Sequence, residues 1–294
     1  MVLIMKRFIS CVIAVLLCIF LCSCSETKTE YQVAATTAPV YEFASYICKG
    51  TDIRVGLVVS HNVSCLHDYT LQTSQMRMLE NAENVVISGA GFEDFLTDVQ
   101  IGGNVIDASA HVPLLCGDFS HEHEGHEHQD QDPHIWLSVT NAMQMANNIY
   151  EGLSISYPHC KEQFSANLCE LQKDLEELDQ YAKNSLQNLS ARQLVTFHDG
   201  FTYMAHAFDL EILHVIEEES GSEASAKELT HICNIVANHN VPAVFTEKNG
   251  SVSAAQIISR ETGAKMYALD MAMSESGYFA AMYHNIDTLK EALQ

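Results

Sequence analysis

The sequence predicts an α/β fold with two lobes of βα units, mostly parallel sheets, one long backbone helix between the lobes and a metal site in the inter-lobe cleft. Three observations support this prediction. Runs rich in β-forming residues alternate with helical runs in both halves of the chain, a pattern typical of parallel sheets. One long amphipathic stretch without Pro or Gly separates the two halves. Histidine and aspartate residues follow several expected strands, where ligands gather in open α/β sheets.

The N-terminal segment has the pattern of an export signal. Two basic residues precede an apolar run over residues 8–22, which is too short to span a membrane comfortably. Residues 21–24, Leu-Cys-Ser-Cys, resemble a bacterial lipobox, which would make Cys24 the lipidated first residue of the mature chain. We expect a lipoprotein signal peptide over 1–23, a tether over 24–30, and an extracytoplasmic protein held by its lipid on the outer face of the cell membrane. The alternative is a plain cleavable signal followed by a soluble protein.

The chain is strongly acidic. Its formal net charge is −23, and removing one Lys and one Arg with the signal gives −23 − 2 = −25. Such a charge argues against a nucleic-acid partner and attracts cations, although it also serves as ordinary solubilising charge. Six of the ten cysteines lie in the body of the chain without any CxxC pairing, and we expect most of them to be small buried side chains. They are Cys48, Cys65, Cys116, Cys160, Cys169 and Cys233.

Residues 31–161 are expected to form the first lobe. Short β-branched runs predict its strands, and apolar residues at helical spacing predict its helices. In chain order we expect a strand over 31–36, a helix over 40–49 ending at Gly50, a strand over 53–59, a helix over 71–82, strands over 84–88 and 104–107, a polar loop over 110–133 and a helix over 139–153.

The amphipathic stretch predicts the linking helix over residues 162–190. Apolar residues recur every three or four positions from Phe164 to Leu189, which corresponds to a helix on the order of 40 Å long. Core helices are usually shorter, so we interpret this one as the connection to a second lobe over 191–294. There we expect, in chain order, strand 194–197, helix 201–208, strand 211–215, helix 226–239, strand 241–246, helix 253–262 with Gly263 as its C-cap, strand 265–269 and a helix from about residue 278.

Four residues at the ends of different elements form a candidate metal site: His67, His134, His198 and Asp270. His198 and Asp270 directly follow expected strands, His67 lies in the loop after the strand over 53–59, and His134 precedes the helix over 139–153, so folding brings them to the cleft at the carboxyl ends of the strands. Neutral imidazole is the commonest protein ligand for metals, and three imidazoles with one carboxylate suit a tetrahedral zinc ion. A lone histidine in a loop is usually a solvated side chain, but four matched positions favour a metal site.

Three segments resemble the zinc- and manganese-binding proteins of bacterial metal-uptake ABC transporters, the ZnuA/TroA-like family. The most specific is Asp132-Pro-His-Ile-Trp-Leu-Ser-Val-Thr-Asn-Ala142, which resembles the family's DPHxWLDPxNA segment. The stretch Val195-Thr-Phe-His-Asp-Gly-Phe-Thr-Tyr203 resembles the family's third-ligand segment, and residues 261–270 resemble the stretch with the fourth ligand. The similarity runs from about residue 31 to the end.

This resemblance implies that the four candidate residues bind Zn²⁺, or alternatively Mn²⁺. It also implies that a monomeric carrier delivers the ion to the membrane permease and ATPase of an ABC transporter. His198 stands where manganese-type members tend to carry Glu, which favours zinc. The segment before His67 lacks the family's proline, which leaves His61 or Cys65 as substitute ligands. Glu247, after the strand over 241–246, is an alternative carboxylate ligand.

A His-rich loop over residues 120–131 resembles the insert of zinc-type members. It alternates histidine with glutamate and lacks apolar residues, so it cannot bury a core. Its histidines either collect zinc near the site or belong to a spacer that binds metal only in vitro. They are His121, His123, His126 and His128.

Several alternatives stay open. A manganese or iron carrier, and a surface adhesin or metal buffer, fit the same fold. A zinc hydrolase needs an open metal position and a general base, whereas four ligands close the shell and the sequence has no His-Glu-x-x-His motif, so we do not expect an enzyme. Asp68, Asp132 and Asp199 each lie within two residues of a candidate histidine and either accept a hydrogen bond from its ring or face water.

Overall fold

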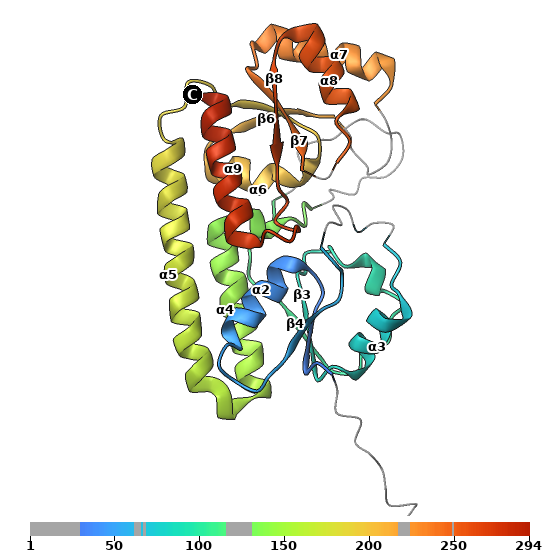
Figure 1. Ribbon diagram of the computed structural model, residues 1–294, viewed down its shortest axis with the longest axis vertical. Helices are drawn as coiled ribbons and strands as arrows, with labels where there is room; N and C mark the ends of the chain where they lie inside the picture. The colour runs from blue at the N-terminus through green and yellow to red at the C-terminus, as the bar shows by residue number, and fades with distance from the viewer. Residues whose placement is uncertain (1–29, 62–65, 67–68, 116–130, 217–223, 249) are drawn as a thin grey trace, which may run out of the picture. The chain divides into compact units, whose positions relative to one another are not determined.

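The computed structural model describes residues 30–61, 66, 69–115, 131–216, 224–248 and 250–294. These residues contain two four-stranded sheets, in the orders β2-β1-β3-β4 and β6-β5-β7-β8 (Figure 1). All strand pairs within them are parallel. The strands are β1 Val33–Ala35, β2 Val55–Leu57, β3 Asn84–Ile87, β4 Asn104–Asp107, β5 Gln193–Thr196, β6 Glu211–Val215, β7 Ala243–Glu247 and β8 Lys265–Leu269.

Helices surround these sheets. The α-helices are α2 Ala38–Ile47, α3 Thr73–Asn81, α4 Val139–Ser156, α5 Lys161–Leu186, α6 Thr202–Ala207, α7 Ala226–His239, α8 Ser253–Thr262 and α9 Tyr278–Leu293. Short 3-10 helices occur at η1 Asp94–Leu96, η2 Ile135–Leu137, η3 Pro158–Cys160 and η4 Asp199–Phe201. We call β1 to α4 the first half and β5 to α9 the second half. Among the described residues, no helix is long and apolar enough to cross a membrane.

The two sheets share one topology, since both follow the order 2-1-3-4 when strands are counted within each half. In such sheets the chain direction of the crossovers reverses between the first and third strands, and ligands bind beyond the carboxyl ends of the strands at that point. In the second sheet these strands are β5 and β7. His198 follows β5 after one intervening residue, and Glu247 is the last residue of β7. The topology therefore places two candidate residues at the edge of the sheet where ligands bind.

The predicted fold class is confirmed, and the differences at element ends have local causes. The first helix begins two residues earlier than expected because Pro39 occupies its first turn, where a missing N–H costs nothing. Strand β7 begins only after Pro242, which has no N–H for the sheet. Helix α8 ends at Gly263, whose φ of 81° is left-handed, as expected for a C-cap.

Helix α5 is 26 residues long and packs against both halves of the chain. It contacts α2 and α4 of the first half and α9 of the second, and Figure 1 shows it running alongside them. Its apolar side is fully or almost fully buried at Phe164, Leu171, Leu175, Leu178, Ala182 and Leu186. Its cysteine at position 169 is exposed, contrary to the general expectation for cysteines, because it lies off this apolar side.

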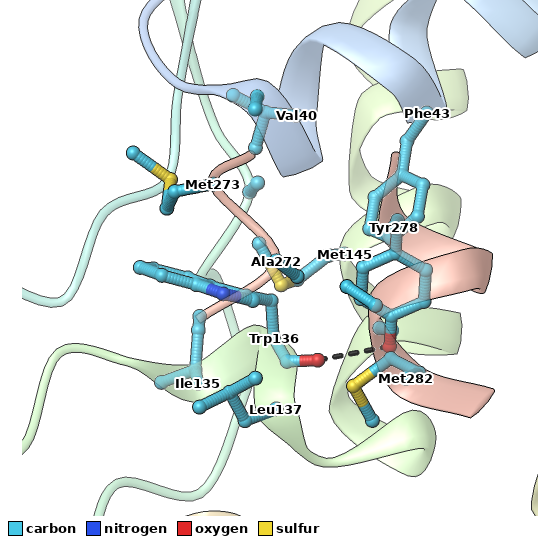
Figure 2. Packing of buried hydrophobic residues seen from close by; sticks show 14 of the residues in the cluster. Val40, Phe43, Ile135, Trp136, Leu137, Met145, Ala272, Met273, Tyr278 and Met282 are labelled. Carbon is cyan, nitrogen blue, oxygen red and sulfur yellow. Dashed lines mark hydrogen bonds between the residues drawn. The ribbon is translucent and has the colours of Figure 1, made fainter. Parts of the chain in front are cut away.

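Trp136 joins the two halves in the buried core. Its indole N–H donates to the backbone oxygen of Met271 at 2.8 Å. Its own backbone oxygen accepts from the Tyr278 hydroxyl at 2.9 Å, the bond drawn as a dashed line in Figure 2. The ring of Tyr278 packs edge-on against Phe43, with centroids 4.9 Å apart. The Tyr278 backbone N–H donates to the carboxylate of Glu42 at 2.8 Å. The segment before α4 is therefore fixed to the segment between β8 and α9.

Replacing Tyr278 with phenylalanine is expected to lower the free energy of unfolding by about 1–3 kcal/mol, because the buried oxygen of Trp136 loses its donor. Urea unfolding followed by circular dichroism measures this change. Tyr181→Phe is the matched control: Tyr181 is partly exposed and its hydroxyl bonds Asp287 at the surface, so a change within about 0.5 kcal/mol is expected. Equal losses in the two variants would contradict the assigned role of Tyr278.

Candidate metal centre

His134 is held in one orientation by the residue two positions before it. Asp132 Oδ1 accepts the backbone N–H of His134 at 2.8 Å and lies 2.8 Å from the ring Nδ1. A carboxylate only accepts, so this contact places the ring hydrogen on Nδ1 and leaves the Nε2 lone pair available for a metal ion. The expected contact between a neighbouring acid and a candidate histidine is thus present at Asp132.

Aromatic rings enclose His134. The ring centroids of Phe92 and Trp136 lie 5.3 Å and 5.4 Å from that of His134, both edge-on. The Tyr203 hydroxyl, from α6 of the second half, donates to the backbone oxygen of Asp132 at 3.0 Å. The imidazole is therefore buried, oriented and shielded from water, and an interaction with a cation there is screened less than at the surface.

His198 reaches the same place from the second half. It precedes η4, and its ring centroid lies 5.1 Å from that of His134 at an interplanar angle of 86°. One ligand atom each from His134, His198 and Asp199 lie within 4.8 Å of one another. We call these three residues the paired-histidine site. Two imidazoles and a carboxylate within this span can bind one divalent ion.

Two groups contact the Nδ1 of His198. In the neutral ring the Gly200 backbone N–H donates to the lone pair of this nitrogen at 2.9 Å, whereas in the protonated ring the Nδ1–H donates to Asp199 Oδ1, which lies 3.0 Å away. Burial raises the pKa of Asp199, but the hydrogen bond and charge of His198, with a smaller contribution from His134, outweigh it and hold that pKa below its usual value. Asp199 therefore remains a carboxylate beside both rings.

Asp270 is buried directly after β8, and both of its side-chain oxygens accept hydrogen bonds. Its Oδ2 accepts from Lys248 Nζ at 3.0 Å and from Ser274 Oγ at 2.7 Å. Its Oδ1 accepts the Ala272 N–H at 2.9 Å, and its backbone is paired twice with the Asn285 side chain at 2.7 Å. Among the described residues, Asp270 is not part of the group whose ligand atoms lie within 4.8 Å of one another.

Glu247 is a second buried carboxylate at this edge of the sheet. Burial raises its pKa, His198 lowers it and Asp270 raises it, with a net upward shift. His198 and Asp270 follow β5 and β8, the two strands that pair with β7, so all three residues lie at the same edge of the sheet. Lys248, the next residue, is the feature that the sequence did not point to, because a lysine after a strand resembles ordinary surface charge.

The remaining candidate ligands fall mostly outside the described residues. His67, Cys65, Cys24 and the four histidines at 121–128 are not described. Leu66, directly before His67, is buried. His61 is described, and its Nδ1 is buried without a hydrogen-bond partner in the described part of the chain. Because most buried polar atoms are hydrogen-bonded, His61 stays open as a ligand.

Gly200 is a residue whose importance the sequence did not reveal. A Cβ added there would lie 2.5 Å from Met271 Cε and 2.9 Å from both Cγ and Nδ1 of His134. The Met271 methyl group can move away, but the His134 ring is fixed by Asp132 and by its aromatic neighbours. Only a glycine fits without displacing the imidazole.

Gly200→Ala is expected to weaken zinc binding about tenfold, because the added methyl group shifts the His134 ring from its position. Titration against a zinc-binding dye measures the change. Gly263→Ala is the control: the same methyl group meets no atom within 4 Å there, so only stability should fall, through its φ of 81°. An unchanged zinc affinity in Gly200→Ala would show that the ring tolerates the added group.

Comparison with known proteins gives consistent results. A family model described as zinc-uptake complex component A, periplasmic, matches residues 33–292. The zinc-binding lipoprotein AdcA of Streptococcus pneumoniae is 28% identical over 309 residues, covering 98% of this chain and 61% of the relative. The zinc-binding protein AdcA of Streptococcus pyogenes is 27% identical over 290 residues, covering 89% and 56%. The chain thus spans only about three-fifths of the length of these relatives.

Solved structures share the fold. A crystal structure of ZnuA is similar with a TM-score of 0.77 and 26% identity, covering 90% of this chain and 100% of that one. The structure of FpvC from Pseudomonas aeruginosa in complex with Mn²⁺ has a TM-score of 0.79 and 25% identity, covering 90% and 98%. Both are structures with which this chain shares its arrangement of sheets and helices.

Proposed function

The chain belongs to the zinc-uptake complex component A family, and from this premise we propose that it captures one Zn²⁺ ion between its two halves and delivers it to a membrane permease. The supporting observation is the paired-histidine site, where His134 and His198 converge from different halves of the chain. Imidazole nitrogen suits zinc better than manganese, which prefers oxygen ligands. The family consists of metal-binding transport proteins, and we propose no catalytic role.

The proposed ligands are His67, His134, His198 and Asp270. His134 and His198 are already adjacent. Asp270 would bind the ion either through the second lone pair of Oδ1, which accepts the Ala272 N–H, or through Oδ2 after exchange of its bonds with Lys248 and Ser274. Alternative donors are Asp199, Glu247, His61 and Cys65. Protons compete for the same imidazole nitrogens, so affinity falls in acid and binding releases protons.

The location and partners follow from the same premise. We propose a signal peptide over 1–23, lipidation at Cys24, a tether over 24–30, and lobes over 31–161 and 191–294 around a linking helix over 162–190. The protein would then act as a monomer on the outer face of the cell membrane, beside the permease and ATPase of an ABC transporter. The loop over 120–131 would supply weak zinc sites near the main one.

Competition titration of the metal-free protein tests the proposal. Zn²⁺ is expected to displace Mn²⁺, and alanine at each proposed ligand is expected to weaken zinc binding. Glu247→Gln, His61→Ala and Cys65→Ser should leave zinc affinity unchanged, and a loss in one of them would transfer the ligand role to that residue. Cells without the protein are expected to grow poorly only when zinc is scarce. A preference for Mn²⁺ would assign the protein to manganese uptake instead.

A further inference from the structure

We propose a second metal site, formed by Asp52, His159 and Cys160, that binds a thiophilic divalent cation such as Zn²⁺ or Cd²⁺. One ligand atom from each of these residues lies within 4.8 Å of the other two. We call these residues the Cys160 cluster. None of them belongs to the paired-histidine site, so the inference goes beyond the proposed function.

The chain holds these three residues together from two separate segments. His159 and Cys160 belong to η3, and Cys160 is the N-cap of α5. Asp52 lies in the turn after α2, where the Thr51 hydroxyl donates to the Cys48 oxygen at 2.7 Å and the Ile53 N–H donates to the Thr51 hydroxyl at 3.3 Å. The turn is therefore ordered rather than free.

A buried hydrogen-bond pair fixes the turn to α5. The side-chain amide of Asn167, itself buried, donates to the backbone oxygens of Ile47 and Lys49 at 2.8 Å and 2.7 Å. These bonds set the position of the α2 end relative to the start of α5. The two backbone segments that carry the three donors are therefore held next to each other.

The donor set suits a borderline-soft ion. Thiolate sulfur, imidazole nitrogen and carboxylate oxygen are the three zinc-ligand types, and three protein ligands leave a fourth position for water. Asp52 and His159 are exposed while Cys160 is buried, so an ion can enter from solvent and reach the sulfur.

The free thiol is protonated at neutral pH. Burial, and to a lesser degree the charge of Asp52, raises the pKa of Cys160. A bound cation reverses both effects, because it replaces the thiol proton and pairs with Asp52. Metal binding at the Cys160 cluster therefore releases a proton.

The thiol of Cys48 lies near Cys160, so the alternative to metal binding is a disulfide between these two cysteines. Burial, with a contribution from Cys160, raises the pKa of Cys48 to about 12. In an oxidising compartment two cysteines can form a disulfide, with both thiols giving up their protons and electrons to an external disulfide oxidant. The observed closeness of three different ligand atoms favours the metal site over the disulfide.

Titration of the full-length protein with Cd²⁺, under non-reducing conditions, tests the proposal through the ultraviolet charge-transfer absorption of a cadmium–thiolate bond. A site of histidine and aspartate ligands gives no such band. We expect the band in the wild type and in His134→Ala, which separates this site from the proposed function. Its loss is expected in Cys160→Ser, together with a weaker binding curve in His159→Ala and Asp52→Asn.

Two matched variants complete the experiment. Cys169→Ser removes an exposed thiol from the same helix and should keep the band. Cys233→Ser removes a partly buried thiol on α7 and should also keep it. The proposal is overturned if the wild type shows no band, if the band survives in Cys160→Ser, or if mass spectrometry of the purified protein finds Cys48 and Cys160 joined as a disulfide.

Discussion

Replacing His134 with alanine is expected to lower zinc affinity by more than about 100-fold, the upper end of what removal of a ligand's hydrogen-bond partner costs. The substitution removes a buried ring nitrogen that Asp132 orients and two aromatic rings enclose. It also leaves the Asp132 carboxylate buried without the ring to which it bonds. Competition with a chelator of known affinity, at constant pH, measures the loss.

Two further variants serve as comparisons for the loss of zinc affinity in His134→Ala. Asp132→Asn keeps the imidazole but removes its acceptor charge, so a loss of about 10–100-fold is expected, smaller than that of His134→Ala. His206→Ala removes an exposed histidine on α6 and should leave affinity unchanged. A zinc affinity for His134→Ala within a few-fold of the wild type would remove His134 from the ligand set, and with it the main support for the proposed function.

Glu93 is expected to make the protein less stable as pH rises toward neutral. Its carboxylate is buried and accepts from the Thr36 hydroxyl at 2.7 Å and from the Ser88 and Gly89 N–H groups at 2.6 Å and 3.0 Å. Burial outweighs these bonds and raises the pKa of Glu93 from 4.5 to about 7. The folded state holds the Glu93 proton more tightly than the unfolded state does. The protonated side chain therefore stabilises the fold fully below about pH 4.5, and this stabilisation is lost as pH rises through about 7.

The expected size of this effect is about 3 kcal/mol, from a difference of roughly two and a half pKa units at about 1.4 kcal/mol each. The Gln side chain in Glu93→Gln cannot ionise. The free energy of unfolding of the variant minus that of the wild type should therefore increase by most of this amount between about pH 5 and about pH 8. Urea unfolding at several pH values measures the gap. Glu80→Gln alters an exposed carboxylate and should show no such trend. A constant gap for Glu93→Gln would mean that Glu93 ionises normally.

Most of the fold follows from local features of the chain. Gly263 marks a helix end where backbone chemistry alone decides, and the apolar spacing between Phe164 and Leu189 identified α5. The start of α2 at Ala38 was missed because Pro39 fits the first turn of a helix as well as the residue before one. Strand ends were less predictable because pairing sets them: β2 is limited to the three residues that pair with β1. The residues of a strand do not by themselves determine where its partner strand ends.

The candidate metal site also contains some residues that the sequence could predict and some contacts that it could not. His134 and His198 were predictable because both flank regular elements at the edge where parallel strands end. The engagement of Asp270 by Lys248 and the fit of Gly200 against His134 were not, since each depends on residues distant in sequence. Lys248 meets Asp270 only when β7 and β8 have paired, and Gly200 meets His134 only when the two halves have packed.

The packing of α5 against both halves implies that neither can be produced alone. A fragment ending after α5 would keep the helix but lose α9, and its leucine stripe at 178 and 186 would face water. Exposed apolar surface of this kind leads to aggregation. The chain should therefore melt in one cooperative step, with no stable half-folded species on the way.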